Sequence, residues 1–109
     1  MRPISKPVKK ELTKDKFMES CCVPGCPNKD IEYNHAIIYA GRQLDKAYAI
    51  VPVCKYHHRG NNGTIFRIAK DWSTLWAITR GRGKIEKDCP KENWFQLKKH
   101  LENKLKATL

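Results

Sequence analysis

Cysteine and histidine residues form two short chelating loops in this sequence. In the first, Cys21 or Cys22 is separated from Cys26 by a turn that contains a proline and a glycine. In the second, two residues separate Cys54 from His57. Thiolate and imidazole ligands at these spacings suit tetrahedral Zn²⁺, and two such loops fill all four coordination positions. The sequence therefore predicts a structural zinc site, and the spacing leaves open which of the first two cysteines is a ligand.

The number of cysteines favours metal binding over disulfide formation. The chain has five cysteines, and an odd number in a reducing compartment argues against a disulfide framework. The basic N-terminal stretch lacks the continuous apolar run of a secretory signal, so we expect a cytoplasmic protein. Cys89 and the unused thiol of the first loop are expected to be small buried side chains.

Among the histidines outside the zinc site, His35 and His58 are expected to lie close together in the fold. Metal-assisted hydrolysis of a phosphodiester needs a neutral imidazole that takes a proton from water. It also needs a site that holds a divalent ion against the phosphate. These two histidines can supply both functions.

Short β-rich runs over residues 33–39 and 47–53, joined by a turn-prone segment, predict a hairpin that positions these residues. Apolar residues three or four positions apart then predict helices over 64–78 and 91–107. We therefore expect an α+β fold with additional C-terminal helices.

The length of 109 residues allows one domain with a modest core. We expect this domain over residues 19–109, with its zinc-stapled core over 21–63. Residues 1–18 are basic and contain two prolines, which predicts a flexible N-terminal arm.

The charge balance indicates a polyanionic partner. Lys and Arg number 22 against 11 Asp and Glu, a formal net charge of +11. Nucleic acid is the commonest partner for such a charge. The longest uncharged apolar run, residues 47–53, is far below the ~20 residues that a membrane span requires, so we expect no membrane association.

The segment over residues 21–62 resembles the HNH (ββα-metal, His-Me finger) endonuclease family, particularly small zinc-containing phage and bacterial members. The strings that carry this resemblance are CCVPGC, YNHAIIYAG and IVPVCKYHHRGNN. The resemblance implies a zinc-stapled ββα-metal fold. It favours Cys21 over Cys22 as the zinc ligand that joins Cys26, Cys54 and His57.

The same resemblance implies roles in catalysis. His35 matches the general base, Asn34 and His58 match the ligands of a catalytic Mg²⁺ or other divalent ion, and Asn62 falls where the family often has a final His or Asn. The implied activity is one-metal hydrolysis of DNA phosphodiester bonds, in phage or mobile-element DNA processing.

Arginines are the expected contacts to DNA. Arg42 or Arg59 would steady the scissile phosphate, and Arg67, Arg80 and Arg82 would add further contacts.

Asn34, Ala49 and the glycines Gly60 and Gly63 depart from the family pattern, and Asn34 favours an alternative. Asn34 stands where the family commonly has Asp, His or Glu, and a neutral amide is a weaker ligand for a hard cation. Ala49 stands where many members have Asn. The alternatives are a catalytically weak zinc domain that binds DNA, and a protein that docks to an acidic host surface. The sequence leaves open whether the protein is a homodimer.

Overall fold

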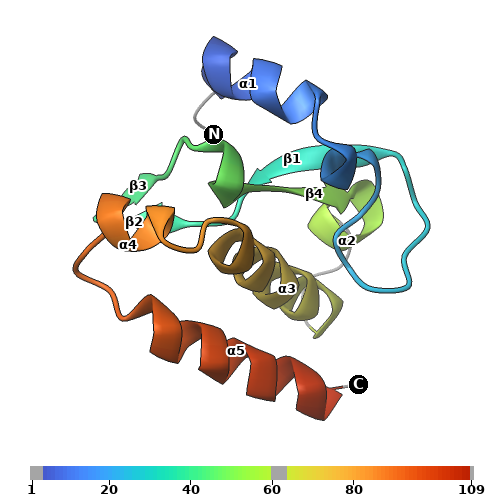
Figure 1. Ribbon diagram of the computed structural model, residues 1–109. Helices are drawn as coiled ribbons and strands as arrows, with labels where there is room; N and C mark the ends of the chain where they lie inside the picture. The colour runs from blue at the N-terminus through green and yellow to red at the C-terminus, as the bar shows by residue number, and fades with distance from the viewer. Residues whose placement is uncertain (1–3, 60–63, 109) are drawn as a thin grey trace.

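The computed structural model describes residues 4–59 and 64–108, with side chains described for 4–58 and 69–106. It has a small α+β fold (Figure 1), as the sequence predicts. Among the described helices, none combines the length and apolarity needed to cross a bilayer. In chain order the elements are α1 (Lys6–Thr13), the 3-10 helix η1 (Lys16–Glu19), β1 (Ile31–His35), β2 (Ile38–Tyr39), β3 (Arg42–Gln43), the 3-10 helix η2 (Ala47–Ala49), β4 (Ile50–Cys54), α2 (Lys55–Arg59), α3 (Thr64–Arg80), α4 (Lys84–Asp88) and α5 (Trp94–Thr108).

The central sheet consists of the antiparallel strands β1 and β4. Ile31 lies opposite Cys54, and His35 lies opposite Ile50. The predicted hairpin is confirmed, although its first strand ends at His35 instead of continuing to residue 39. The chain turns there into a second antiparallel pair, β2 and β3, which is closed by Ala40 and Gly41 at φ 53° and 79°. A two-residue turn with both φ values positive matches the right-handed twist of the strands that it joins.

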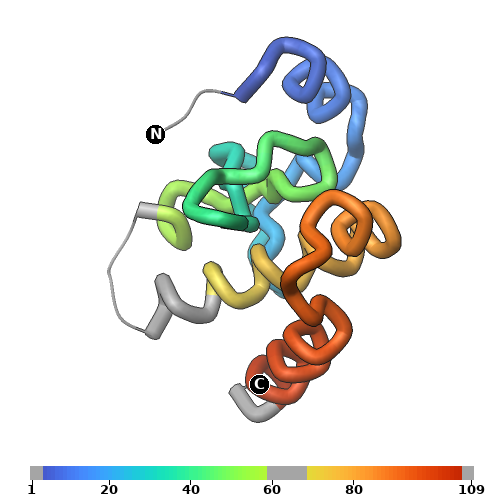
Figure 2. Tube along the Cα trace, turned by 90° about the vertical axis from the view of Figure 1, so that its left-hand side faces the viewer, coloured from blue at the N-terminus to red at the C-terminus, as the bar shows by residue number. Residues whose placement is uncertain are grey.

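The sheet separates two groups of packed side chains. Val51 and Val53 pack in the larger core with buried residues of α3 and α5. Ile50 points the other way, because successive side chains of a strand alternate between faces, and it packs with the N-terminal segment. The resulting layers are α1, the sheet, α3 and α5 (Figure 1), and the turned view in Figure 2 keeps α3 next to α5.

The C-terminal helices follow the apolar periodicity closely. The sequence predicts helices over 64–78 and 91–107, and the structure has α3 and α5 at these places. The short helix α4 lies between them, in a segment that the sequence presents as a basic link. Before α4 the chain passes close to Tyr48 at Gly81. A Cβ at this position would lie 2.0 Å from the ring of Tyr48, so glycine is required there. The hydroxyl of Tyr48 donates a hydrogen bond to Asp88 at 2.9 Å, which ties η2 to α4.

The N-terminal segment differs from the flexible arm that the sequence predicts for residues 1–18. The structure has α1 and η1 in this segment, and Leu12 is only 1% exposed. Leu12 packs with Met18 and Ile50 on the face of the sheet opposite α3. The N-terminal segment is therefore part of the folded domain from Ile4 onward.

A weak apolar stripe explains this packing. Val8 and Leu12 are four residues apart and share one face of α1, and Ile4, just before the helix, packs against the same apolar cluster. The many lysines between them hide the stripe in a reading of composition alone.

Leu12→Ala is expected to lower the free energy of unfolding by about 2–5 kcal/mol, because it empties a fully buried site between α1 and the sheet. Urea denaturation monitored by circular dichroism measures the loss. Ile38→Ala is the matched control, since Ile38 is 67% exposed and its truncation should cost less than ~0.5 kcal/mol. Equal losses in the two variants would contradict the packing of α1 on the sheet.

Candidate functional site

Three thiols and one imidazole converge at one end of the sheet. Cys21 and Cys26 lie on the loop before β1, Cys54 ends β4, and His57 lies in α2. Their ligand atoms all lie within 4.8 Å of one another. The Sγ atoms of Cys26 and Cys54 are 3.9 Å apart, and Nδ1 of His57 lies 3.1 Å from Sγ of Cys54 and 3.5 Å from Sγ of Cys21. These four residues are called the Cys3His cluster below.

The separations in the Cys3His cluster fit one tetrahedral metal ion. Zn–S bonds of ~2.3 Å at tetrahedral angles place two sulfur ligands about 3.8 Å apart, and a sulfur and a nitrogen about 3.6 Å apart. A disulfide requires about 2.05 Å between sulfurs, so the 3.9 Å separation excludes a Cys26–Cys54 disulfide in this structure and matches the spacing of two sulfur ligands on one ion. The cluster can hold a metal such as zinc, and Cys21 is the member that the spacing left undecided.

Backbone hydrogen bonds shape the first chelating loop. The N–H of Cys26 donates to the carbonyl of Val23 at 3.0 Å, and Gly25 takes φ 84° between them. This conformation favours glycine because other residues meet a steric penalty there. The N–H of Cys21 donates to the carbonyl of Asn28 at 3.0 Å. The loop therefore turns back on itself and presents both thiols to one point.

Burial and hydrogen bonds have opposite effects on the pKa values of thiols in the Cys3His cluster. Burial raises the pKa of Cys21 to about 11. Burial also opposes ionisation of Cys54, but hydrogen bonds from the backbone N–H of His57 and from neighbouring thiols outweigh it, so the pKa of Cys54 lies below its ordinary value. Burial lowers the pKa of His57, which favours the neutral imidazole that a metal binds.

Cys22 and Cys89 lie outside the Cys3His cluster. Cys22 is buried, its N–H donates to the carbonyl of Pro52 at 2.8 Å, and its carbonyl accepts a hydrogen bond from Nε1 of Trp76 at 3.0 Å. Burial raises the pKa of both thiols. Both cysteines are the small buried side chains that the sequence predicts.

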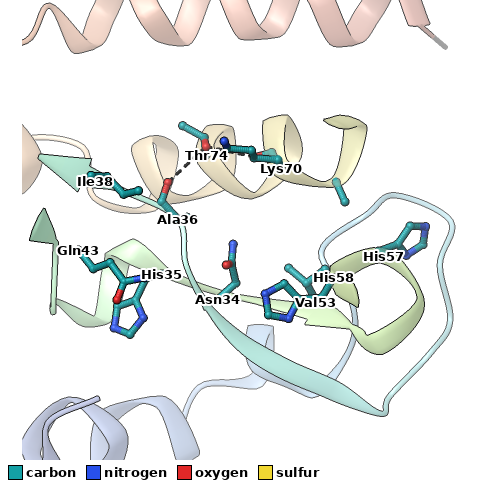
Figure 3. Close-up of a pocket in the computed structure, with 11 residues that line it drawn as sticks. Asn34, His35, Ala36, Ile38, Gln43, Val53, His57, His58, Lys70 and Thr74 are labelled. Carbon is teal, nitrogen blue, oxygen red and sulfur yellow. Dashed lines mark hydrogen bonds between the residues drawn. The ribbon is translucent and has the colours of Figure 1, made fainter. Parts of the chain in front are cut away.

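A cleft of about 240 Å³ lies beside the Cys3His cluster, between β1, α2 and α3 (Figure 3). Asn34, His35, His57 and His58 all contribute to its lining. The structure therefore gathers three of the predicted catalytic residues around one cavity, next to the predicted zinc ligands. Figure 3 shows Asn34 and the ring of His58 on one side of β1, and His35 on the other side beside Gln43.

The His58 imidazole is held by a carboxylate. Nδ1 of His58 lies 2.9 Å from Oε1 of Glu32, and both side chains are about one-fifth exposed. A carboxylate that accepts the Nδ1 proton fixes the tautomer and leaves Nε2 as a lone-pair donor. His58 is therefore prepared to bind a cation or accept a proton through Nε2.

Asn34 is held by α3. Its Nδ2 donates a hydrogen bond to Oγ of Ser73 at 2.8 Å, and Ser73 is fully buried. This orientation uses the amide nitrogen and leaves Oδ1 as a neutral oxygen ligand for a hard cation.

His35 is much less accessible than the sequence suggests. Its side chain is 2% exposed, and its Nε2 lies 3.9 Å from Oδ1 of Asp45. The other carboxylate oxygen of Asp45 accepts a hydrogen bond from the N–H of Ser5 at 3.3 Å. The alternation of β1 explains the placement, because His35 and Asn34 are neighbours in the strand and must point to opposite faces.

Three of the predicted DNA-contacting arginines, Arg42, Arg80 and Arg82, have described side chains, and none of these three lines the cleft. Arg42 and Arg82 are exposed on β3 and beside α4. Arg80 forms an ion pair with Asp15, and its guanidinium lies 4.2 Å from the centre of the Phe17 ring. These contacts join the end of α3 to the N-terminal segment, so the structure assigns Arg80 a packing role.

Asn62 and the side chains of Arg59 and Arg67 lie outside the described residues, so their predicted roles stay predictions.

Sequence reasoning missed two charged groups of the site, Glu32 and Lys70. Glu32 stands two residues before Asn34, and the period of a strand places residues i and i+2 on one face. That spacing could have identified it. Lys70 is exposed and lines the cleft from α3. No spacing could have identified Lys70, because its place depends on how α3 packs.

Searches of protein-family models, curated proteins and solved structures found no match to this chain. The function is therefore inferred from the geometry of the Cys3His cluster and of the cleft.

The purified protein is expected to contain one zinc ion per chain, and Cys21→Ala should lose it together with much of the folded structure. Cys22→Ala is the matched control and should keep one zinc, since the thiol of Cys22 lies outside the cluster. Elemental analysis and circular dichroism measure both effects. Zinc retained by Cys21→Ala and lost by Cys22→Ala would overturn the ligand assignment.

Proposed function

We propose that this protein is a metal-dependent DNA endonuclease of the HNH type, in which the Cys3His cluster is a structural zinc site. The observation that carries the proposal is the cleft itself, which places Asn34 and His58 together beside that cluster. In this proposal Asn34, through Oδ1, and His58, through Nε2, would hold the catalytic divalent ion, such as Mg²⁺. When bound, it would stabilise charge on the scissile phosphate and on the leaving 3′ oxygen.

The residues of the chain have distinct tasks in this mechanism. His35 accepts a proton from the attacking water as general base. Glu32 orients His58 through the 2.9 Å contact with Nδ1. Lys70, on the α3 side of the cleft, offers a positive charge to the phosphate. The net charge of +11 attracts DNA to the whole surface.

The mechanism requires a local movement of His35. Its Nε2 faces Asp45 and its side chain is 2% exposed, so a water molecule reaches the imidazole only after the ring turns or Asp45 withdraws. A general base must come within about 2.6–3.2 Å of the proton that it takes, directly or through one water, and catalytic hydrogen bonds often tighten only when substrate is bound. DNA and metal binding would supply the free energy for this movement.

A second candidate function is a zinc domain that binds DNA without cutting it. The covered imidazole of His35 and the neutral side chain of Asn34 favour this alternative. Incubation of supercoiled plasmid with the protein and Mg²⁺ or Mn²⁺ separates the two functions. Nicked product supports the endonuclease, whereas salt-sensitive retention of intact plasmid supports the binding domain.

His35→Ala is expected to reduce divalent-dependent nicking by about 10²- to 10⁴-fold, because general-base catalysis contributes that much. Zinc content and DNA affinity should not change, because His35 is outside the Cys3His cluster. His100→Ala is the matched control, since His100 is exposed on α5, and it should nick DNA at the rate of the unchanged protein. Full activity in His35→Ala would remove His35 from the mechanism.

Glu32→Gln is expected to weaken divalent-ion activation about 10- to 100-fold, because His58 loses the carboxylate that orients it. Excess metal should restore much of the nicking rate, since the substitution removes no atom that acts on DNA. The metal dependence of the rate measures this shift. Asp30→Asn, which changes an exposed carboxylate near the start of β1, serves as control, and an equal shift in that variant would contradict a specific role for Glu32.

A further inference from the structure

A second concave surface lies on the other side of α3, between α3 and α5. Its volume is about 410 Å³, larger than that of the candidate catalytic cleft. It is called the α3–α5 groove below, and its principal lining residues are Trp72, Leu75 and Trp76 of α3 and Lys98, Leu105 and Lys106 of α5.

The α3–α5 groove is separate from the candidate catalytic cleft. Lys70 and Thr74 line the cleft, whereas Trp72 and Trp76 line the groove. At about 100° per residue these pairs fall on different sides of α3. Figures 1 and 2 agree that α5 lies along α3 on the side away from the sheet. A ligand of the groove would therefore leave the cleft open.

Two tryptophans form a fixed aromatic platform in the groove. The rings of Trp72 and Trp76 are stacked, with centroids 6.2 Å apart and an interplanar angle of 26°. Nε1 of Trp76 donates to the carbonyl of Cys22 at 3.0 Å, which fixes the orientation of that ring. Leu75 and Leu105 are buried below them, while both tryptophans are only partly buried. The platform thus offers flat apolar surface that is already ordered.

The charge around the groove is positive. Helix α5 carries four lysines and one glutamate. Glu102 is paired with Lys98 at 3.2 Å, and Asp71 of α3 is paired with Lys104 at 2.9 Å. Glu102 is the acidic residue among those that line the groove, and its pairing with Lys98 leaves the positive charge of Lys106 in excess there. A complementary ligand combines a flat apolar group with negative charge.

We infer that the α3–α5 groove binds an unpaired base of single-stranded DNA, stacked on Trp72, with the adjoining phosphates beside the lysines of α5. Base stacking on aromatic side chains next to a basic surface is the general mode of single-strand binding. A duplex buries its base faces in its own stack, so it cannot use the platform. The inference rests on the proposed function for DNA as the ligand, and it deepens that function to a preference for DNA with unpaired bases.

Photo-crosslinking of the unchanged protein tests the inference directly. A 12-nucleotide oligo(dT) in which one thymine is replaced by 5-iodouracil is irradiated with the zinc-loaded protein in buffer without added divalent metal. Peptide mapping should place the crosslink on Trp72 or Trp76. A crosslink confined to residues outside the groove would overturn the inference.

Fluorescence anisotropy with the same oligonucleotide supplies the quantitative test. Trp72→Leu should weaken single-strand binding by roughly 5- to 150-fold, the range expected for one stacked base. Binding to a 12-base-pair duplex should not change. The matched control is Phe95→Leu, because Phe95 is 71% exposed on α5 outside the groove. Equal affinities of the Trp72 and Phe95 variants, or equal losses on single strand and duplex, would overturn the inference.

The competing occupant of the groove is a second copy of the chain. Sedimentation that shows a dimer in the unchanged protein and a monomer in Trp72→Leu would overturn the DNA assignment. Because binding is measured without divalent-dependent cleavage, an absence of nicking would reject the proposed enzyme and leave the result for the groove standing. Zinc content and circular dichroism measure whether each variant is folded. If Trp72→Leu does not fold, the position of the crosslink in the unchanged protein tests the inference.

Discussion

The rest of the structure depends on the convergence of four ligands at one end of the sheet. The first chelating loop precedes β1, Cys54 ends β4, and His57 lies one turn into α2. A single ion bound to the Cys3His cluster would therefore connect the two ends of the sheet to the helix that follows it. A chain of 109 residues has a modest apolar core and a small net stability, so such a constraint would contribute a large share of the total. It also places His58, the residue after a ligand, at the edge of the cleft.

The alternation of side chains along β1 divides the chemistry between the two faces of the sheet. Glu32 and Asn34 point toward α2 and α3, where they contact His58 and Ser73. His35 points toward the N-terminal segment, where Asp45 lies 3.9 Å from its Nε2. The cleft is thus lined by Asn34, on the face of β1 toward α3, and by His35, the last residue of β1. Helix α1 influences the site through Ser5 and Asp45, although it contributes no residue to the lining.

The metal cluster and the class of fold could be predicted from local spacing. Chelating pairs within six residues, β-rich runs and helical apolar periodicity are short-range features that tertiary contacts do not alter. The features that could not be predicted depend on long-range packing. Spacing alone leaves Cys21 and Cys22 open, although the family resemblance favours Cys21, and in the structure hydrogen bonds to Asn28 and Pro52 orient the two residues. The role of Arg80 follows from its contact with Asp15, which is 65 positions away in the chain.

The burial of His35 is the clearest example of a feature that sequence patterns do not predict. The sequence of a five-residue strand specifies which of its residues share a face. Which element covers each face depends on residues in other parts of the chain. Here the N-terminal segment packs against Ile50, on the face of the sheet that carries His35, and the apolar residues of this segment, Ile4, Val8 and Leu12, stand among lysines in the sequence. The same limit applies to Lys70, which becomes a functional candidate only when α3 is packed beside β1 and α2.

The central claim is that the cleft beside the Cys3His cluster binds a catalytic divalent ion. Anomalous diffraction from crystals of the zinc-loaded protein soaked in Mn²⁺ tests it most directly, because manganese and zinc are distinguished at their absorption edges. The account predicts a manganese peak in the cleft, within bonding distance of Oδ1 of Asn34 and Nε2 of His58, and a separate zinc peak in the cluster. Full occupancy of the cluster by zinc with no manganese between Asn34 and His58 would contradict the account.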